Sequence, residues 1–232
     1  MPHSDEIWYA AKATRVILAP RRELETFGET SIHYYVVSAL LDAVNQVRVR
    51  QGQVQAERPR VITPRYFVSQ ALENFGKEAQ EYIEGILNSA EGVRILQYGL
   101  RFRKQEYSEE TVQGNTDEVA DQVSRHVRDR DELFSGVIIG VDDLWEVSLL
   151  RFVSDVVRGS APGHFRELAG RGLLDAPRGN VPNAVRIEIE SEFRAAAGDR
   201  ERIGQLGRKL REYGLFAEYE DRFFALLKET KK

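Results

Sequence analysis

Apolar and polar side chains alternate in the early part of the chain, which is the pattern of β-strands with two different faces. Residues 14–18 (TRVIL) and 32–38 (IHYYVVS) are rich in β-branched and aromatic side chains, and Pro20 and Gly28 interrupt the pattern between them. We therefore predict one strand at each of these two segments.

The segment 45–65, which begins NQVRVRQGQVQAERPR, predicts an arginine-rich hairpin. Its strands would cover 47–50 and 53–57, with Gln51 and Gly52 as the turn. In that register one face carries only apolar side chains, those of Val47, Val49, Val54 and Ala56. We expect this face to lie against the core and the arginines to face solvent.

From Thr63 onward the spacing of apolar residues changes to that of helices, with a further strand predicted somewhere within 93–106. Helices are predicted at 63–86, with Thr63 as the cap, at 115–128, where Val119, Val123 and Val127 form one stripe, and from about 144 to 158. After Pro182 the chain is helical and rich in charge, and a pair of helices is broken at Gly214.

These elements predict an α+β fold. We expect an N-terminal, mainly antiparallel sheet of about five strands packed against helices, with a helical C-terminal section. Strands come early and helices late, which disfavours a doubly wound parallel sheet. The predicted domains are a mixed α+β domain, 1–178, and the helical section, 179–232, which can also belong to the same domain.

The last helical pair carries Leu206, Gly207, Leu210, Gly214, Phe216 and Phe223. At this spacing the segment resembles one tetratricopeptide-type helical hairpin. The chain shows no convincing second copy, and stacked repeats need several copies to bury a core. The resemblance therefore assigns no family.

Composition narrows the possible classes of protein. Hydrophobic residues make up 42% and charged residues 30%, the net charge is -4, and there is no cysteine. A disordered chain, a disulfide scaffold and a thiolate metal site are thereby excluded. The N-terminal stretch has no pattern of an export signal, and no apolar run has the length of a membrane span. We expect a cytoplasmic protein that does not enter membranes.

Signatures of catalysis are scarce. The chain has no phosphate-binding loop, dinucleotide fingerprint, zinc-protease motif or nucleophile elbow, and its four histidines lack ligand spacing, so neither a metal nor a cofactor is predicted. The acidic cluster in GVDDLWE is the weak candidate for catalysis: Asp142, Asp143 and Glu146 can bind a metal or act as acid and base. Asp143 and Glu146 also match a capping box that opens a helix, and we favour that reading.

Arginines supply the other candidate site. The predicted hairpin and the run YGLRFRKQEY at 98–107 offer cations to an anionic partner, namely Arg48, Arg50, Arg58, Arg60, Arg101 and Arg103. The surface doubles if the two runs form adjacent strands. The competing reading, which the acidic net charge favours, is the solvated face of a sheet.

The leading functional hypothesis is a non-enzymatic protein that binds another macromolecule, with a protein partner favoured over nucleic acid. It rests mainly on the missing catalytic signatures. One alternative is an enzyme whose site is assembled from dispersed residues around Asp142, Asp143 and Glu146. The other is a nucleic-acid-binding module that uses the hairpin 45–65. The oligomeric state stays open.

Overall fold

The computed structural model describes residues 4–41, 43–58, 72–73, 75–87, 102–175 and 181–229. The chain divides into two compact units, Met1–Phe165 and Arg166–Lys232. This division falls within one long helix. The predicted boundary at 178 lies outside the described residues and stays a prediction.

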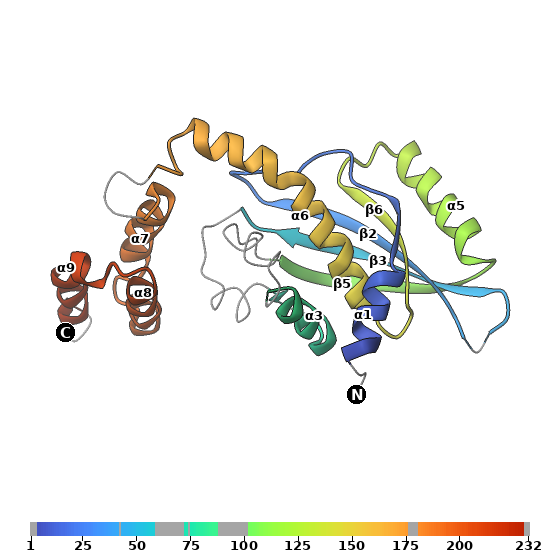
Figure 1. Cartoon of the computed structure of the whole chain (residues 1–232), viewed down its shortest axis with the longest axis horizontal. Coiled ribbons are helices and arrows are strands. Elements are labelled where there is room, and N and C mark those ends of the chain that lie inside the picture. Colours follow the sequence, from blue (N-terminus) through green and yellow to red (C-terminus); the bar gives the residue numbers. More distant parts are fainter. Residues whose placement is uncertain are drawn as a thin grey trace. The chain divides into compact units, whose positions relative to one another are not determined.

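The first unit is built on a mixed sheet, whose described strands follow the order β1-β6-β2-β3-β5-β4 (Figure 1). The strands are β1 (Arg15–Leu18), β2 (Thr30–Ala39), β3 (Gln46–Ala56), β4 (Leu72–Glu73), β5 (Phe102–Gln113) and β6 (Ser135–Gly140). The pairs β2/β6 and β4/β5 are parallel and the other three are antiparallel. The predicted α+β fold, with an N-terminal and mainly antiparallel sheet, is confirmed.

Helices cover both faces of this sheet. One core contains residues of α1 (Ser4–Ala13), α3 (Lys77–Leu87) and α6 (Trp145–Gly170) together with alternate residues of β2 and β3. The other core contains residues of α5 (Thr116–Asp129) and the opposite faces of β2, β3 and β6. We call these the α6 face and the α5 face. The sheet is therefore the middle of three layers.

The predicted hairpin does not form, because Gln46–Ala56 is one continuous strand that pairs with β2 on one side and β5 on the other. Val47 and Val49 are buried on the α5 face, whereas Val54 and Ala56 are buried on the α6 face. All four apolar side chains are thus in the core, as expected, but in two different cores. The apolar residues stand at odd-numbered positions before Gln51 and at even-numbered positions after Gly52. They therefore move from one face of the sheet to the other while the strand continues in the same direction.

Two glycines let α6 lie close to the sheet. A Cβ atom added to Gly136 of β6 would stand 2.2 Å from a ring carbon of Phe152, and one added to Gly140 would stand 2.6 Å from Oγ of Ser148. Glycine in a strand commonly marks such a close approach. The run GVIIGV at 136–141, for which we predicted no strand, supplies most of β6, and α6 follows it after a short loop.

Other predicted elements are partly confirmed. The helix at 115–128 is α5, and its cap Asn115 accepts a hydrogen bond from the Glu118 N–H. The helix predicted at 63–86 is wrong at Leu72 and Glu73, which form β4, and α3 begins at Lys77. The rest of that segment up to 71, including the predicted cap Thr63, lies outside the described residues. The strand predicted within 93–106 corresponds to β5, which continues to Gln113.

In the described part of the second unit, the end of α6 is followed by α7 (Asn183–Ala195), α8 (Arg200–Glu212) and α9 (Phe216–Glu229). The predicted break at Gly214 is confirmed, with a positive φ of 67°. The Leu215 N–H donates to the Leu210 carbonyl and the Gly214 N–H to the Arg211 carbonyl, the bonding pattern of a Schellman cap. The helical C-terminal section is therefore also confirmed.

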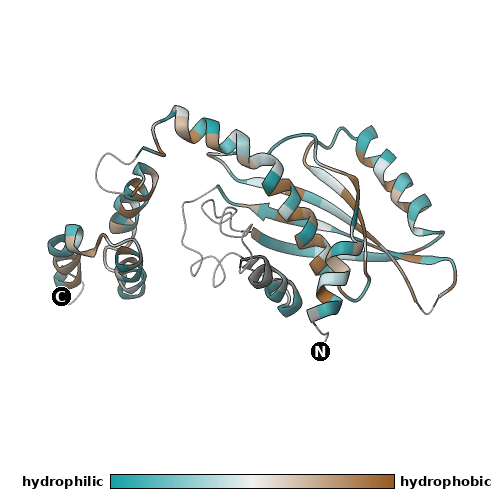
Figure 2. Ribbon diagram, viewed as in Figure 1, coloured by the Kyte–Doolittle hydropathy of each residue, from teal (hydrophilic) through white to brown (hydrophobic). Residues whose placement is uncertain are grey.

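No helix in the described part of the chain has both the length and the apolar character needed to cross a membrane. In Figure 2 the helices around the sheet contain both hydrophilic and hydrophobic residues.

The two-core arrangement predicts unequal effects of acid substitution along β3. Val49 is 4% exposed in the α5-face core, and Gln51, two residues along the same face, is exposed. We expect Val49→Asp to lower the free energy of unfolding by about 3 kcal/mol or more, because it buries an unpaired charge. Gln51→Asp should change it by less than about 0.5 kcal/mol. Urea denaturation measures both, and equal losses would contradict the placement of Val49.

Candidate functional site

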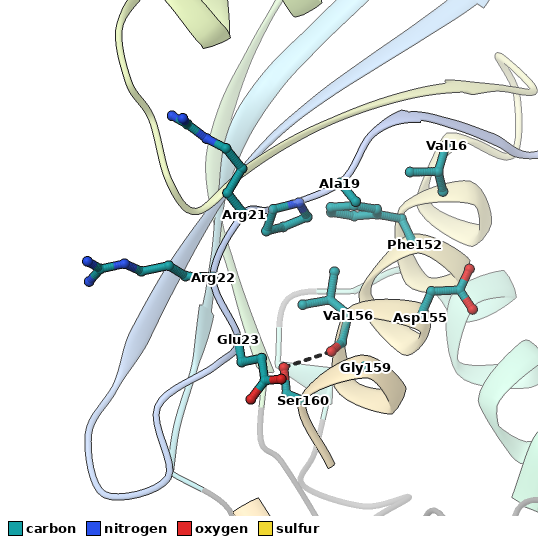
Figure 3. Close-up of a pocket in the computed structure, with 11 residues that line it drawn as sticks. Val16, Ala19, Arg21, Arg22, Glu23, Phe152, Asp155, Val156, Gly159 and Ser160 are labelled. Carbon is teal, nitrogen blue, oxygen red and sulfur yellow. Dashed lines mark hydrogen bonds between the residues drawn. The ribbon is translucent and has the colours of Figure 1, made fainter. Parts of the chain in front are cut away.

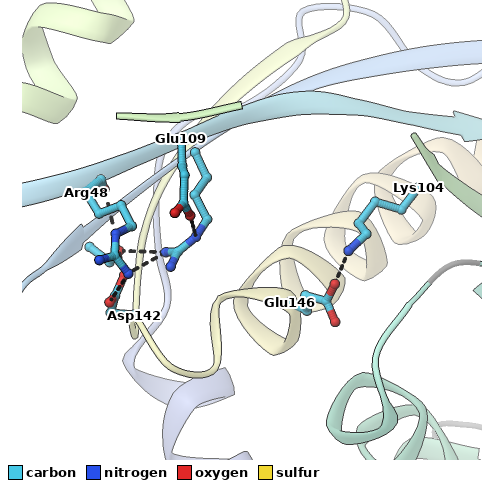
Figure 4. A network of polar contacts seen from close by, with 7 residues as sticks. Arg48, Lys104, Glu109, Asp142 and Glu146 are labelled. Atoms are coloured by element: carbon cyan, nitrogen blue, oxygen red, sulfur yellow. Dashed lines mark hydrogen bonds and ion pairs between the residues drawn. The ribbon is translucent and has the colours of Figure 1, made fainter. Parts of the chain in front are cut away.

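The loop between β6 and α6 brings the predicted acidic cluster and the predicted arginines together. Asp142 accepts hydrogen bonds from Nη1 of Arg48 at 2.9 Å and from Nη1 of Arg50 at 2.7 Å (Figure 4). The Ser38 hydroxyl also donates to Asp142, at 2.7 Å. One carboxylate therefore holds two arginines of β3 and one serine of β2, although it lies 92 residues from Arg50 in the sequence.

Arg50 is the most buried cation of this group, with a side chain that is 6% exposed. Its Nε donates to Glu109 of β5 at 3.2 Å, in addition to the bond with Asp142. We call Ser38, Arg48, Arg50, Glu109 and Asp142 the Asp142 network. It contains two cations and two carboxylates, so its formal charge is zero. The prediction that these arginines face solvent is wrong for Arg50, because even-numbered residues of β3 point toward α6.

A second group surrounds Trp145 at the start of α6. The Lys104 ammonium group of β5 contacts a carboxylate oxygen of Glu146, and it lies 4.8 Å from the centre of the Trp145 ring. The other carboxylate oxygen of Glu146 accepts the Gly76 N–H at 2.7 Å. The ring of Tyr107 lies 4.7 Å from that of Trp145, and the ring of Tyr34 6.2 Å. We call these five side chains, Tyr34, Lys104, Tyr107, Trp145 and Glu146, the Trp145 cluster.

The two groups touch through Arg50, whose guanidinium carbon lies 5.3 Å from the centre of the Trp145 ring. Cations placed over an indole face are attracted by the negative potential of its π-system. The Trp145 ring is therefore in contact with two cations, Arg50 of β3 and Lys104 of β5. The start of α6 is fixed to two adjacent strands by ion pairs and ring contacts.

A β-bulge explains how one strand supplies so many of these groups. Gly52 pairs with Tyr107 and Val54 with Lys104, so that Gln105 and Glu106 of β5 together oppose the single residue Gln53. The additional residue shifts the alternation of β5 by one position. Tyr107 and Glu109 consequently join Lys104 on the α6 face.

Gly52 leaves room for two aromatic rings. A Cβ atom at this position would stand 2.7 Å from the Tyr34 hydroxyl and 3.0 Å from Cβ of Tyr107. Tyr34 is 1% exposed, and its hydroxyl has no hydrogen-bond partner among the described residues. Burial raises the pKa of Tyr34 well above its usual 10.0, the negative charge of Glu146 raises it further, and Arg50 opposes them.

The predicted capping box does not form. Glu146 directs its carboxylate to Lys104 and Gly76 instead of the preceding turn, and Asp143 is exposed with no partner in the described part of the chain. The Leu144 carbonyl accepts the Val147 and Ser148 N–H groups and so begins the helix. Asp142, Asp143 and Glu146 have separate surroundings. Within the described ranges, no group of three or more histidine or acidic side chains could hold a metal ion.

The remaining predicted arginines lie outside these groups. Arg58 and Arg103 are exposed, and Arg60 and Arg101 lie outside the described residues. The two arginine-rich runs do contribute adjacent strands, since β3 pairs with β5. Their adjacency brings acids of β5 beside the arginines of β3, so it does not double a positive surface there.

Four residues of this site were not predicted from the sequence: Ser38, Lys104, Tyr107 and Glu109. Tyr107 and Lys104 were visible in the run YGLRFRKQEY, but alternation alone would place Lys104 and Tyr107 on opposite faces. Only the bulge places them together. No local signal in the sequence marks a bulge at Gln105 and Glu106.

A cavity of about 250 Å³ lies elsewhere, between residues 16–23 and α6 (Figure 3). Phe152, Val156, Ala19 and Pro20 contribute apolar walls. Much of its polar lining is already paired: Arg21 with Asp131, Asp155 with Arg151, and the Ser160 hydroxyl with the Leu24 N–H. In Figure 3 the Arg22 side chain points away from Phe152. Polar groups therefore do not converge on this cavity as they do around Trp145.

The edge of β5 that faces away from β3 forms the exposed border of the site. The Gly114 N–H donates to the Asn45 carbonyl at 2.9 Å, so pairing with β3 uses the backbone groups of every second residue, Val112, Glu110 and Ser108. The N–H and C=O groups of Tyr107, Glu109, Thr111 and Gln113 consequently point away from β3. Among the described residues, β4 pairs only with Phe102 and Arg103, and no strand pairs with β5 beyond them on that side. We call this margin, residues 105–113, the β5 edge.

Removal of Asp142 should destabilise the protein through the cations that it leaves behind. The Asp142 side chain is 14% exposed and that of Arg50 is 6% exposed. We expect Asp142→Ala to lower the free energy of unfolding by about 3 kcal/mol, since breaking a buried ion pair leaves an uncompensated charge. The adjacent Asp143→Ala is the matched control, with an expected change below about 0.5 kcal/mol. Chemical denaturation decides, and similar losses for the two variants would contradict the network.

Tyr34 should make the folded state sensitive to alkaline pH. Its pKa is raised in the folded protein, so its contribution to stability is complete below pH 10 and is lost as pH rises from there through the folded pKa. Tyr34→Phe should therefore weaken the fall of stability above pH 10. It should not lower the melting temperature at neutral pH, because the hydroxyl has no described partner to lose. Melts of both proteins between neutral pH and about pH 11 provide the measurement; identical alkaline profiles would refute this role of Tyr34.

Comparison with known proteins adds no relative. No protein-family model, no curated protein and no solved structure matches the chain. The features of this chain that bear on its function are therefore the two groups around α6 and the β5 edge.

Proposed function

We propose that this chain is a protein-binding protein that accepts an extended segment of its partner as an additional strand on the β5 edge. The supporting observation is the row of backbone groups at Tyr107, Glu109, Thr111 and Gln113, which point outward and pair with no described strand. Unpaired strand edges are templates for another chain. In this mode of recognition, main-chain hydrogen bonds supply affinity and alternate side chains supply specificity.

The accessibility of the edge favours this function. All residues from Gln105 to Thr111 are exposed. The nine residues 105–113 extend over about 30 Å at strand geometry, which is long enough for a partner segment of ordinary strand length. In Figure 2 this strand is coloured hydrophilic over much of its length, which is compatible with exposure to water when no partner is bound.

The two polar groups give the edge a fixed shape. On the α6 face of β5, Lys104 pairs with Glu146 and Glu109 pairs with Arg50. Tyr107 packs against Trp145 on the same face. These contacts hold the strand before any partner arrives. A binding edge that is already ordered costs less conformational entropy on association.

The geometry gives less support to the alternatives. For nucleic acid, Arg48 and Arg50 would have to leave Asp142 in order to bind phosphate. For an enzyme at the acidic cluster, the three carboxylates Asp142, Asp143 and Glu146 have separate surroundings. Both alternatives require a rearrangement that strand addition does not need.

Proline at Thr111 tests the proposed function. The Thr111 N–H points outward, so Thr111→Pro should remove one docking hydrogen bond and leave the pairing with β3 intact. Thr111→Ala, which keeps the N–H, is the matched control. The probe is a displayed library of random dodecapeptides selected on the wild-type protein. We expect selected peptides to bind wild type and Thr111→Ala alike, and Thr111→Pro at least tenfold more weakly, as measured by fluorescence anisotropy.

A second measurement does not depend on the folding of the proline variant. A selected peptide should slow hydrogen exchange at the amides of Tyr107, Glu109, Thr111 and Gln113 in the wild-type protein. Amides at Ser108 and Glu110 already bond to β3 and should change less. Protection confined to other parts of the chain, or a library that yields no binder, would refute strand addition at β5.

A further inference from the structure

The β5 edge carries negative charge without basic side chains of its own. Its exposed acids are Glu106, Glu109 and Glu110, and the sequence 105–113, QEYSEETVQ, contains no lysine or arginine. Lys104 lies just before it, with a side chain that is 10% exposed and directed at Glu146. Within residues 105–113, the only charged side chains that an added strand would meet are therefore acids.

These acids lie on both faces of the strand. Glu109 is on the α6 face with Tyr107, whereas Glu110 pairs opposite Val49 and is on the α5 face. Glu109 is bonded to Arg50, yet its side chain remains 49% exposed. Directly opposite side chains on neighbouring strands lie about 5 Å apart, close enough for ion pairing. A cation on either face of an added strand thus meets a carboxylate.

The aromatic ring next to Glu109 strengthens the preference on the α6 face. Tyr107 is 42% exposed, so part of its ring is open to a cation. A lysine or arginine that reaches Glu109 from an added strand passes this ring, and aromatic faces attract cations.

The same charges disfavour a second copy of this chain as the occupant. When two β5 edges pair antiparallel about a twofold axis, the arrangements with the longest overlap have the axis at Ser108, Glu109 or Glu110. The first arrangement places Glu106 opposite Glu110, the second Glu109 opposite Glu109, and the third Glu110 opposite Glu110. Like charges in direct opposition destabilise strand pairing, and charged edges are a common means of preventing self-association.

We infer that the partner segment is a basic strand, with lysine or arginine side chains that pair with Glu106, Glu109 and Glu110. This inference rests on the proposed function, because it specifies the chemistry of the strand that β5 accepts. Three ion pairs of ordinary strength correspond to roughly a tenfold gain in affinity over a neutral strand.

Three synthetic ten-residue peptides test the inference, with pairs of threonines alternating with pairs of lysines, glutamines or glutamates, so that the charged side chains lie on both faces of the added strand. Fluorescence anisotropy with the full chain should show the lysine peptide binding at least tenfold more tightly than the glutamine peptide, and the glutamate peptide most weakly. The preference should shrink at about 0.5 M salt, where surface charges are screened. The double variant Glu106→Gln, Glu110→Gln should reduce it severalfold and leave the glutamine peptide unaffected.

The controls separate the inference from the proposed function on which it rests. Binding of the lysine peptide must fall at least tenfold in Thr111→Pro, because plain attraction to negative charge would survive that change. If all three peptides bind equally and all are lost in Thr111→Pro, strand addition stands and the basic partner is refuted. If no peptide binding depends on Thr111, both fail. A wild-type dimer in sedimentation equilibrium that Thr111→Pro dissociates would make a second copy the occupant and overturn the inference.

Discussion

The double ion pair of Asp142 is the interaction on which the architecture around the sheet depends. β3 buries Arg50 on a face that otherwise belongs to an apolar core, and an unpaired guanidinium there would cost several kcal/mol. Asp142 removes that cost by bonding Arg50 and Arg48 at once. The pairing is possible only if the loop after β6 returns across β2 to β3, so it also fixes where α6 begins.

The close contact of α6 with the sheet follows from this starting point. Gly136 and Gly140 remove side chains where Phe152 and Ser148 approach β6. Trp145, one turn before Ser148, then lies over β3 and β5, between Arg50 and Lys104. Small residues on the strand and a large aromatic residue on the helix are complementary parts of the same packing arrangement.

The α6 face of β5 and the edge of β5 that faces away from β3 have different roles. On the α6 face, the bulge at Gln105 and Glu106 directs Tyr107 and Glu109 toward α6, where they contact Trp145 and Arg50. On the edge away from β3, the backbone of residues 105–113 pairs with no described strand. A strand that is rigid on one side and open on the other is suited to receive another strand, and its acids restrict what that strand can be.

The sequence by itself determined the elements whose signals are local. The strands at 15–18 and 30–39, helix α5 and the break at Gly214 all follow from alternation, helical spacing or cap chemistry within a few residues. Only the tertiary structure decided which face each charged side chain occupies. The alternation of side chains along a strand predicts that Arg48 and Val49 point to opposite faces of the sheet. It does not predict which face is covered by helices, and in this structure both faces are covered. The partners that settle the matter, Asp142 for Arg48 and Glu109 for Arg50, are 94 and 59 residues away, beyond the reach of any local pattern.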